Sequence, residues 1–289
     1  MTRDEFQKLS QDIIILDGAT GSNMIKAGMP RGISTEKWIL EHPEILISLQ
    51  RDYVEAGSQV VMAPTFGANR RTLAMHGLEG QLEEMNRRLV QISQEAVEGR
   101  AYVAGDLSTG GRALGSAEDA TYEEALERYK EQIFCLAKAG ADLLIAETMI
   151  DMDETTAAVE AAHEVCDLPV LCSMTVEADG SIFAGGSAAE AVEMLQEVGA
   201  DAVGINCSVG PDQLPAVVAN MKKVARVPII VKPNAGMPQI TEKGEALYSM
   251  APEDFGKYMK TLVDAGAGII GGCCGTTPEY IREMCKYIR

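Results

Sequence analysis

Short apolar runs alternate along the chain with longer segments in which apolar residues recur three and four positions apart. The short runs are rich in β-branched residues and are followed by turn signals, a pattern typical of parallel strands covered on both faces. We therefore predict eight buried strands, at Ile13–Leu16, Val60–Ala63, Tyr102–Ala104, Leu143–Ala146, Val170–Ser173, Ala202–Ile205, Ile229–Val231 and Gly268–Ile270.

The longer segments have the spacing of amphipathic helices. Several begin with proline, which is favoured at the first helical position, and several are followed by glycine, the usual residue just past a helix end. The predicted helices are Pro43–Ala56, Gln81–Val97, Tyr122–Ala139, Thr155–Val165, Ala188–Val198, Pro211–Val224, Pro252–Ala265 and Pro278–Ile288.

Eight repeats of strand and helix indicate an α/β protein, and we expect a closed (β/α)₈ TIM barrel. An open doubly wound sheet is the alternative. Nothing along the chain resembles a linker, so residues 1–289 are predicted to form a single domain. The stretch Asn23–Trp38 has no clear periodicity, and we expect it to be a loop over the mouth of the barrel.

Composition narrows the class of partner. The net charge is −18 without a basic patch, so nucleic acid and anionic membranes are not expected partners. The first residues are polar, and no apolar run approaches the roughly 20 residues that span a bilayer. We expect a cytoplasmic protein with reduced thiols, so its seven cysteines do not predict a disulfide framework.

Polar and sulfur-containing residues follow the predicted strands. In a barrel, the carboxyl ends of the strands form the active site. These positions hold, in chain order, Asp17-Gly18-Ala19-Thr20-Gly21, Pro64-Thr65-Phe66-Gly67, Gly105-Asp106, Glu147-Thr148, Met174-Thr175, Asn206-Cys207, Lys232-Pro233-Asn234 and Cys273-Cys274.

Three of these residues are candidate metal ligands. Cys207, Cys273 and Cys274 follow the sixth and eighth strands, and the last two lie in a glycine-rich stretch that can turn both side chains the same way. Three thiolates suit tetrahedral zinc and leave a fourth position for substrate. Such an electron-rich site favours binding another thiol as thiolate, and so alkyl transfer to sulfur. A buried pair or a vicinal disulfide is the alternative.

Charged residues at the same end allow two interpretations each. Asp17 and Glu147 could bind a substrate ammonium or act as general bases, or they could pair with Lys232 and with loop amides. Lys232 could form a Schiff base or a structural ion pair. The turn after Asp17 offers backbone N–H groups that could bind a carboxylate, or it is simply a tight turn.

Together these residues resemble the homocysteine S-methyltransferase family, and the resemblance covers nearly the whole chain. The motifs that match are Asp17-Gly18-Ala19-Thr20-Gly21, Thr65-Phe66-Gly67-Ala68-Asn69, Glu147-Thr148, Gly204-Ile205-Asn206-Cys207, Pro233-Asn234-Ala235-Gly236 and Gly271-Gly272-Cys273-Cys274-Gly275-Thr276-Thr277-Pro278. The resemblance implies a (β/α)₈ barrel that transfers a methyl group to the sulfur of homocysteine and so makes methionine.

The resemblance also implies roles for individual residues. Cys207, Cys273 and Cys274 would bind Zn²⁺. Asp17 and Glu147 would be the catalytic residues that bind the amino group of homocysteine. The remaining substrate-binding residues would be Gly18, Ala19 and Thr65, whose backbone would hold the carboxylate, and Asn234 near the metal.

The resemblance leaves more than one candidate for the methyl donor. The chain looks most like the homocysteine-binding module of cobalamin-dependent methionine synthase, but it has no Asp-x-His-x-x-Gly cobalamin motif. The resemblance therefore implies methylcobalamin on a separate corrinoid protein. The alternatives are a self-sufficient enzyme that uses S-methylmethionine, S-adenosylmethionine or betaine, a lysine-dependent lyase using Lys232, and a non-catalytic module that binds metal or thiols.

Overall fold

Eight short parallel strands form the central sheet of the computed structural model, which describes residues 1–110, 120–207, 209–241 and 246–288. In chain order they are β1 (Ile14–Ile15), β2 (Val60–Met62), β3 (Tyr102–Leu107), β4 (Leu143–Met149), β5 (Val170–Met174), β6 (Ala202–Asn206), β7 (Ile229–Lys232) and β10 (Ile269–Ile270).

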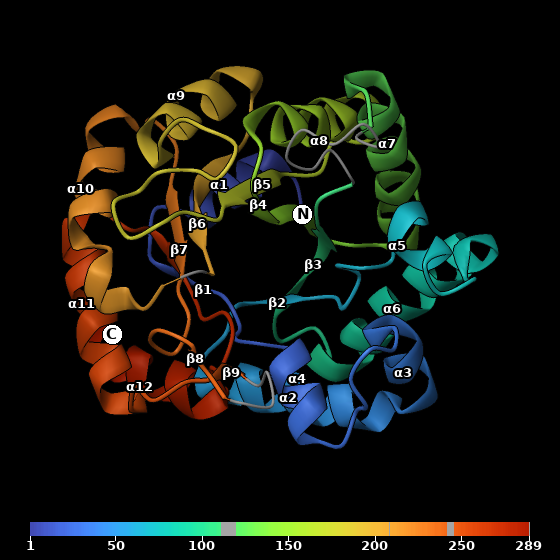
Figure 1. Cartoon of the computed structure of the whole chain (residues 1–289), viewed down its shortest axis with the longest axis horizontal. Helices are drawn as coiled ribbons and strands as arrows, with labels where there is room; N and C mark the ends of the chain where they lie inside the picture. The colour runs from blue at the N-terminus through green and yellow to red at the C-terminus, as the bar shows by residue number, and fades with distance from the viewer. Residues whose placement is uncertain (111–119, 208, 242–245, 289) are drawn as a thin grey trace.

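The two edges of this sheet meet. The strand order is β1-β10-β7-β6-β5-β4-β3-β2, and a parallel bridge between Leu16 and Val60 joins β1 to β2. Helices surround the strands on all sides (Figure 1). The predicted (β/α)₈ barrel is therefore confirmed, and an open doubly wound sheet does not describe the structure.

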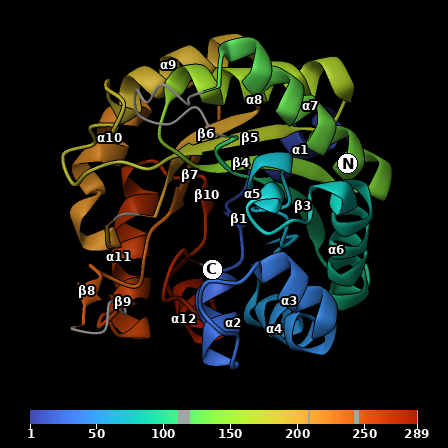
Figure 2. The ribbon, with the colours of Figure 1, turned by 45° about the vertical axis from the view of Figure 1, so that its right-hand side comes forward.

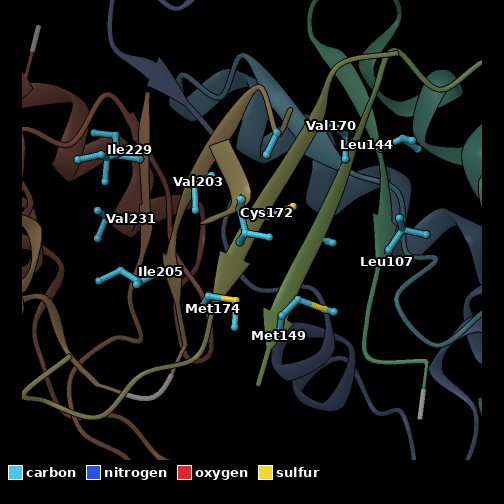
Figure 3. Packing of buried hydrophobic residues seen from close by; sticks show 14 of the residues in the cluster. Leu107, Leu144, Met149, Val170, Cys172, Met174, Val203, Ile205, Ile229 and Val231 are labelled. Atoms are coloured by element: carbon cyan, nitrogen blue, oxygen red, sulfur yellow. The ribbon is translucent and has the colours of Figure 1, made fainter. Parts of the chain in front are cut away.

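Side chains along each strand alternate between the barrel interior and the layer beneath the helices. On β4, Leu143 and Ile145 belong to the interior cluster, whereas Leu144 and Ala146 belong to the outer cluster. Figure 3 shows part of the outer layer, with the side chains of neighbouring strands packed against one another. Burial on both faces explains why the strands read as unbroken apolar runs rather than as alternating ones.

The outer ring consists of the eight helices predicted from periodicity, with small shifts at their ends (Figures 1 and 2). Gly140 and Gly199 end two of them in the left-handed conformation, at φ 88° and 103°, as the glycine pattern indicated. The observed bounds are α4 (Pro43–Ala56), α6 (Leu82–Val97), α7 (Tyr122–Ala139), α8 (Met152–Val165), α9 (Ala188–Val198), α10 (Pro215–Val224), α11 (Pro252–Ala265) and α12 (Pro278–Ile288).

The prediction of a loop over Asn23–Trp38 is wrong in part. This stretch contains most of α2 (Gly21–Lys26) and the start of α3 (Thr35–Glu41). The Ser34 side chain caps α3 by accepting the N–H of Lys37, and Trp38 packs with Met24 in a separate apolar cluster. Helices of six or seven residues are too short to show a clear periodicity in the sequence. Their stability depends on tertiary packing, which the sequence pattern does not reveal.

Other elements had no counterpart among the predictions. They are α1 (Arg3–Leu9), α5 (Arg70–Ala74), the single turn η1 (Glu79–Gln81), and an antiparallel pair of β8 (Gln239–Ile240) and β9 (Ala246–Leu247). The helix predicted at Pro211–Val224 instead begins with a separate single turn, η2 (Pro211–Gln213), before α10. Helix α1 closes the amino end of the barrel, where Phe6 joins the interior cluster. None of the helices in the described part of the chain is long and apolar enough to cross a bilayer.

Candidate active site

A cavity of about 280 Å³ opens at the carboxyl ends of the strands. Its wall includes the turn Gly18–Ser22 after β1, the start of α3, and residues at the ends of β3, β4, β6 and β7. Most of the residues predicted to act on substrate or metal lie on this wall or directly behind it.

The three predicted metal ligands converge on one side of the cavity. The Sγ atoms of Cys207, Cys273 and Cys274 all lie within 4.8 Å of one another, and those of Cys207 and Cys274 are 4.0 Å apart. Tetrahedral zinc with Zn–S bonds of about 2.3 Å places its sulfur ligands roughly 3.8 Å apart. The spacing and the donor set both fit zinc. Cys273 and Cys274 are not joined to each other, so the vicinal disulfide considered above is not formed.

The thiols are arranged to exchange protons for a metal ion. Hydrogen bonding with Cys207, together with burial, raises the pKa of the Cys274 thiol to about 11. A hydrogen bond with Cys207 lowers the pKa of the Cys273 thiol, but a hydrogen bond with Cys274 and burial raise it by more. Cys273 and Cys274 are therefore protonated at neutral pH until a cation takes the place of their protons. Zinc affinity is therefore tied to loss of protons from this cluster.

Backbone geometry aims Cys207 into the cavity. It follows β6 in the left-handed conformation, with φ +63°, and its N–H donates to the Lys232 carbonyl at 3.0 Å. Residues other than glycine rarely adopt this conformation, which costs roughly 1–3 kcal/mol. Gly272, which directly precedes Cys273 and Cys274, has no room for a side chain, since a Cβ there would lie 2.4 Å from Thr276 Oγ1.

Asn206 supports the cluster from the preceding position. Its side-chain amide lies 3.8 Å from Cys273 Sγ and donates to Thr148 Oγ1 at 2.8 Å, while its Oδ1 accepts the Thr148 N–H. Ser173 also donates to Oδ1. Asn206 is 2% exposed and ties the ends of β4, β5 and β6 together behind the thiols.

Asp17 is fully buried directly behind the cavity wall. Its Oδ2 accepts the N–H of Met62, which belongs to strand β2 rather than to a loop, at 2.9 Å, and its Oδ1 has no hydrogen-bond partner among the described residues. Burial raises the pKa of Asp17 to about 7, against the opposing effect of Lys232. A carboxyl in this state is poised to accept a cation.

Glu147 forms an ion pair with Lys232, with 2.6 Å between Oε2 and Nζ. Burial lowers the pKa of Lys232, but the negative charges of Glu147, Asp17 and Cys273 raise it by more than burial lowers it. The net pKa lies above the ordinary value, and the lysine stays charged. A charged, paired amine is a poor nucleophile, and the geometry does not favour a Schiff base. Both side chains line the cavity, and the pair reduces the charge that Glu147 offers to a ligand.

Two further carboxylates, to which the sequence analysis gave no role, also line the cavity. Asp106 ends β3, is 5% exposed, and has an Oδ1 without a partner among the described residues. Glu36 on α3 accepts from the Gly67 N–H and from Ser34 Oγ, each at 2.8 Å. The position of Asp106 after a strand was a usable signal, whereas Glu36 lay in the stretch predicted to be a loop.

The predicted carboxylate-binding backbone is only partly on the wall. Gly18 and Ala19 line the cavity, whereas Thr65 is fully buried behind it and donates its N–H to the Ala63 carbonyl at 2.7 Å. A Cβ on Gly18 would lie 2.7 Å from Tyr53 Oη, so the close approach of the turn requires glycine.

Asn234 also lies behind the wall, just after β7. It is 2% exposed, and its side-chain Oδ1 has no partner in the described part of the chain. Its backbone N–H donates to the Val209 carbonyl at 3.0 Å. A free amide oxygen beside the strands that hold the thiols fits its predicted place near the metal, which stays a prediction.

Comparison with known proteins gives consistent results. A family model described as homocysteine S-methyltransferase matches residues 14–288. The chain is 29% identical, over an alignment of 301 positions, to the methionine synthases of Mycobacterium leprae and Mycobacterium tuberculosis. Each alignment covers 97% of this chain and 25% of the relative, so the chain spans about a quarter of the length of the curated relatives it matches.

Solved structures agree on the fold. The metallated form of the homocysteine methyltransferase MmuM from Escherichia coli superposes with a TM-score of 0.82 at 24% identity, covering 98% of this chain and 99% of that one. Its oxidized form gives the same TM-score at 23% identity. At this identity, the likeness establishes the barrel and its connectivity.

Proposed function

The chain belongs to the homocysteine S-methyltransferase family, whose model covers residues 14–288, and we propose that it methylates the thiol of homocysteine to give methionine. The observation that carries this proposal is the convergence of Cys207, Cys273 and Cys274 on a cavity whose wall also holds carboxylates, with the buried Asp17 directly behind it. The cysteines suit a thiol and the carboxylates suit a cationic group, as an amino acid with a thiol side chain requires.

We assign Cys207, Cys273 and Cys274 as zinc ligands. Zinc bound there would supply the positive charge that keeps a substrate thiol as thiolate at neutral pH. The three cysteines fix the position of that charge, and Asn206 holds Cys273 in place. The protein thereby orients the substrate sulfur toward the open mouth, where a methyl donor can approach in line.

Recognition of the amino acid backbone is assigned to the rest of the wall. Asp17 attracts the ammonium of homocysteine, and Glu147 contributes through its charged pair with Lys232. We assign the substrate carboxylate to the backbone of Gly18, Ala19 and Thr65, and we assign Asn234 a place near the metal. These roles follow the family motif and are compatible with the distances given above.

For the methyl donor, we propose methylcobalamin held outside this barrel. Support comes from the relatives, since the chain aligns along 97% of its length with a quarter of two methionine synthases. A donor that needs no carrier is the second candidate, because the chain also covers 99% of a solved homocysteine methyltransferase.

The test is a single-turnover assay on purified protein of known zinc content. Homocysteine is offered in separate reactions with methylcobalamin, S-methylmethionine, S-adenosylmethionine or betaine, and methionine is quantified. We expect methionine from methylcobalamin. Methionine from a sulfonium donor or betaine would instead establish a self-sufficient enzyme.

Two variants make the assay specific. Cys273→Ser should abolish the reaction, whereas Cys166→Ser, which alters a cysteine outside the cluster, should not. If stoichiometric zinc is present and homocysteine binds but no donor gives methionine, the protein is a thiol-binding module and the proposed activity is wrong. Activity that survives Cys273→Ser but not Lys232→Ala would point to lysine chemistry.

A further inference from the structure

One carboxylate in the cavity is placed like a binding group but has no assigned role. Asp106 ends β3 and lines the cavity, and its side chain is buried apart from a 5% exposed fraction. Its backbone N–H donates to Thr65 Oγ1 at 3.0 Å and its carbonyl accepts from the same hydroxyl at 2.8 Å, so the residue is held rigidly. Its Oδ1 has no partner among the described residues.

The other acidic groups around the cavity differ from Asp106 in one respect each. Glu36 lines the cavity, but both of its oxygens already accept hydrogen bonds. Glu147 lines it too, but is paired with Lys232 at 2.6 Å. Asp17 has an unpaired oxygen, but lies behind the wall. Of these four, Asp106 is the one that combines a place on the wall with a fully buried oxygen that has no partner among the described residues.

The ring order of the strands places Asp106 across the barrel from the thiols. Strand β3 lies three positions from β6, which leads into Cys207, and three positions from β10, which leads into Cys273 and Cys274. A ligand whose sulfur is at the cysteines would therefore extend its other end toward β3. A buried carboxylate with an unsatisfied acceptor is costly unless a cation or donor completes it.

We propose that Asp106 directly contacts the ammonium group of the substrate and thereby selects amino acid thiols over thiols without an amino group. This inference rests on the proposed function, since it takes homocysteine as the ligand. Lys232 pairs directly with Glu147, so Asp106 and Asp17 are the carboxyl groups with an open oxygen, and in their ionised form they attract the ammonium. Asp106 makes the contact, and Asp17 reinforces the field from behind.

The experiment compares two ligands that differ only in the amino group. Zinc-loaded protein is titrated calorimetrically with homocysteine and with 4-sulfanylbutanoate, which has the same thiol and carboxylate but no ammonium. The measured quantity is the ratio of the two dissociation constants, in which the thiol contribution cancels. Wild-type protein should prefer homocysteine, and Asp106→Asn should reduce that preference by about 10- to 100-fold, as expected for loss of a charged hydrogen bond.

The matched control is Glu36→Gln, which removes the same charge from the same cavity at a carboxylate whose oxygens already have partners. It should change the preference by less than about threefold. Unchanged binding of 4-sulfanylbutanoate to Asp106→Asn would show that the fold and the zinc site are intact.

The outcomes separate the two proposals. If wild-type protein binds homocysteine and Asp106→Asn keeps the full preference, the role of Asp106 is wrong and the proposed function stands. The same holds if Asp106→Asn and Glu36→Gln lose the preference equally, because general charge then explains it. If wild-type protein binds no homocysteine, the proposed function fails and this inference fails with it.

Discussion

Aspartates at the amino end of the barrel and those at its carboxyl end have different partners. Asp142 accepts the N–H of Val103 at 2.8 Å and lies 3.7 Å from the amino-terminal NH₃⁺. Asp201 likewise accepts the N–H of Val170 at 2.9 Å and pairs with an arginine of α1. At the carboxyl end, Asp17 and Asp106 each retain an oxygen without a partner in the described part of the chain.

Strained backbone conformations are also found at the carboxyl end of the barrel. Of the three non-glycine residues with positive φ in the described chain, Thr148 and Cys207 lie at the carboxyl ends of strands, and Glu98 caps helix α6. Strain and unsatisfied polar groups cost stability and persist where the surroundings hold them for another purpose. The comparison teaches that the aspartates at the amino end stabilise the fold, whereas those at the carboxyl end keep an oxygen available for a ligand.

The largest effect should follow from removing a metal ligand at the carboxyl end. In Cys273→Ser, a hydroxyl replaces the thiolate, and two sulfurs hold zinc poorly. We expect zinc content below stoichiometry after dialysis and a loss of methyl transfer of at least about 1000-fold. Metal analysis and the single-turnover assay measure both. Full zinc content with full activity would contradict the site.

A smaller effect should follow from neutralising the buried carboxylate behind the wall. Asp17→Asn can still accept the Met62 N–H but loses its charge. We expect KM for homocysteine to rise about 10- to 100-fold, the range for loss of a charged interaction, with little change in kcat. Steady-state kinetics with the true donor decides this. An unchanged KM would remove Asp17 from substrate recognition.

The pH dependence of binding should reveal the same group. Burial raises the pKa of Asp17 to about 7, so below that pH the empty site holds a proton that the substrate ammonium must displace. The preference for homocysteine over 4-sulfanylbutanoate should therefore increase up to about pH 7, by at most about tenfold per pH unit, and level off above it. Burial, reinforced by Glu147, also raises the pKa of Asp106, which acts in the same direction.

Calorimetric titrations between pH 5.5 and 8.5 would test this dependence. Asp17→Asn serves as the control, because its curve should lose the inflection near pH 7. A preference that stays constant across the range in wild-type protein would contradict the assignment of a titrating carboxyl near the ammonium.

The smallest effect should come from the amino end and should appear in stability alone. Asp201→Ala leaves the Val170 N–H without its partner, which costs about 1–2 kcal/mol. The melting temperature should fall by a few degrees while KM and kcat are unchanged. Differential scanning calorimetry and kinetics on the same sample test this. A changed KM or kcat in this variant would contradict the assignment of a purely structural role to the amino end.

The regular parts of the barrel were accessible from the sequence because they follow local rules. Apolar runs and helical spacing located all eight strands of the barrel and the helices of the outer ring, with Pro43–Ala56 and Ala188–Val198 predicted at their observed bounds. The short helices α2 and α3 were missed, since a few residues carry too little periodicity and their positions depend on tertiary packing.

The candidate site likewise has features that the sequence predicted and features that only the tertiary structure determined. The barrel pattern by itself determined that Cys207, Cys273 and Cys274 would meet, because the carboxyl ends of parallel strands share one rim. The sequence did not reveal which carboxylate would be paired and which would be free. Tertiary structure decided that Lys232 engages Glu147 and that Asp106 keeps an open oxygen. Such pairings depend on distances of a few ångströms between residues far apart in the chain, to which no local pattern is sensitive.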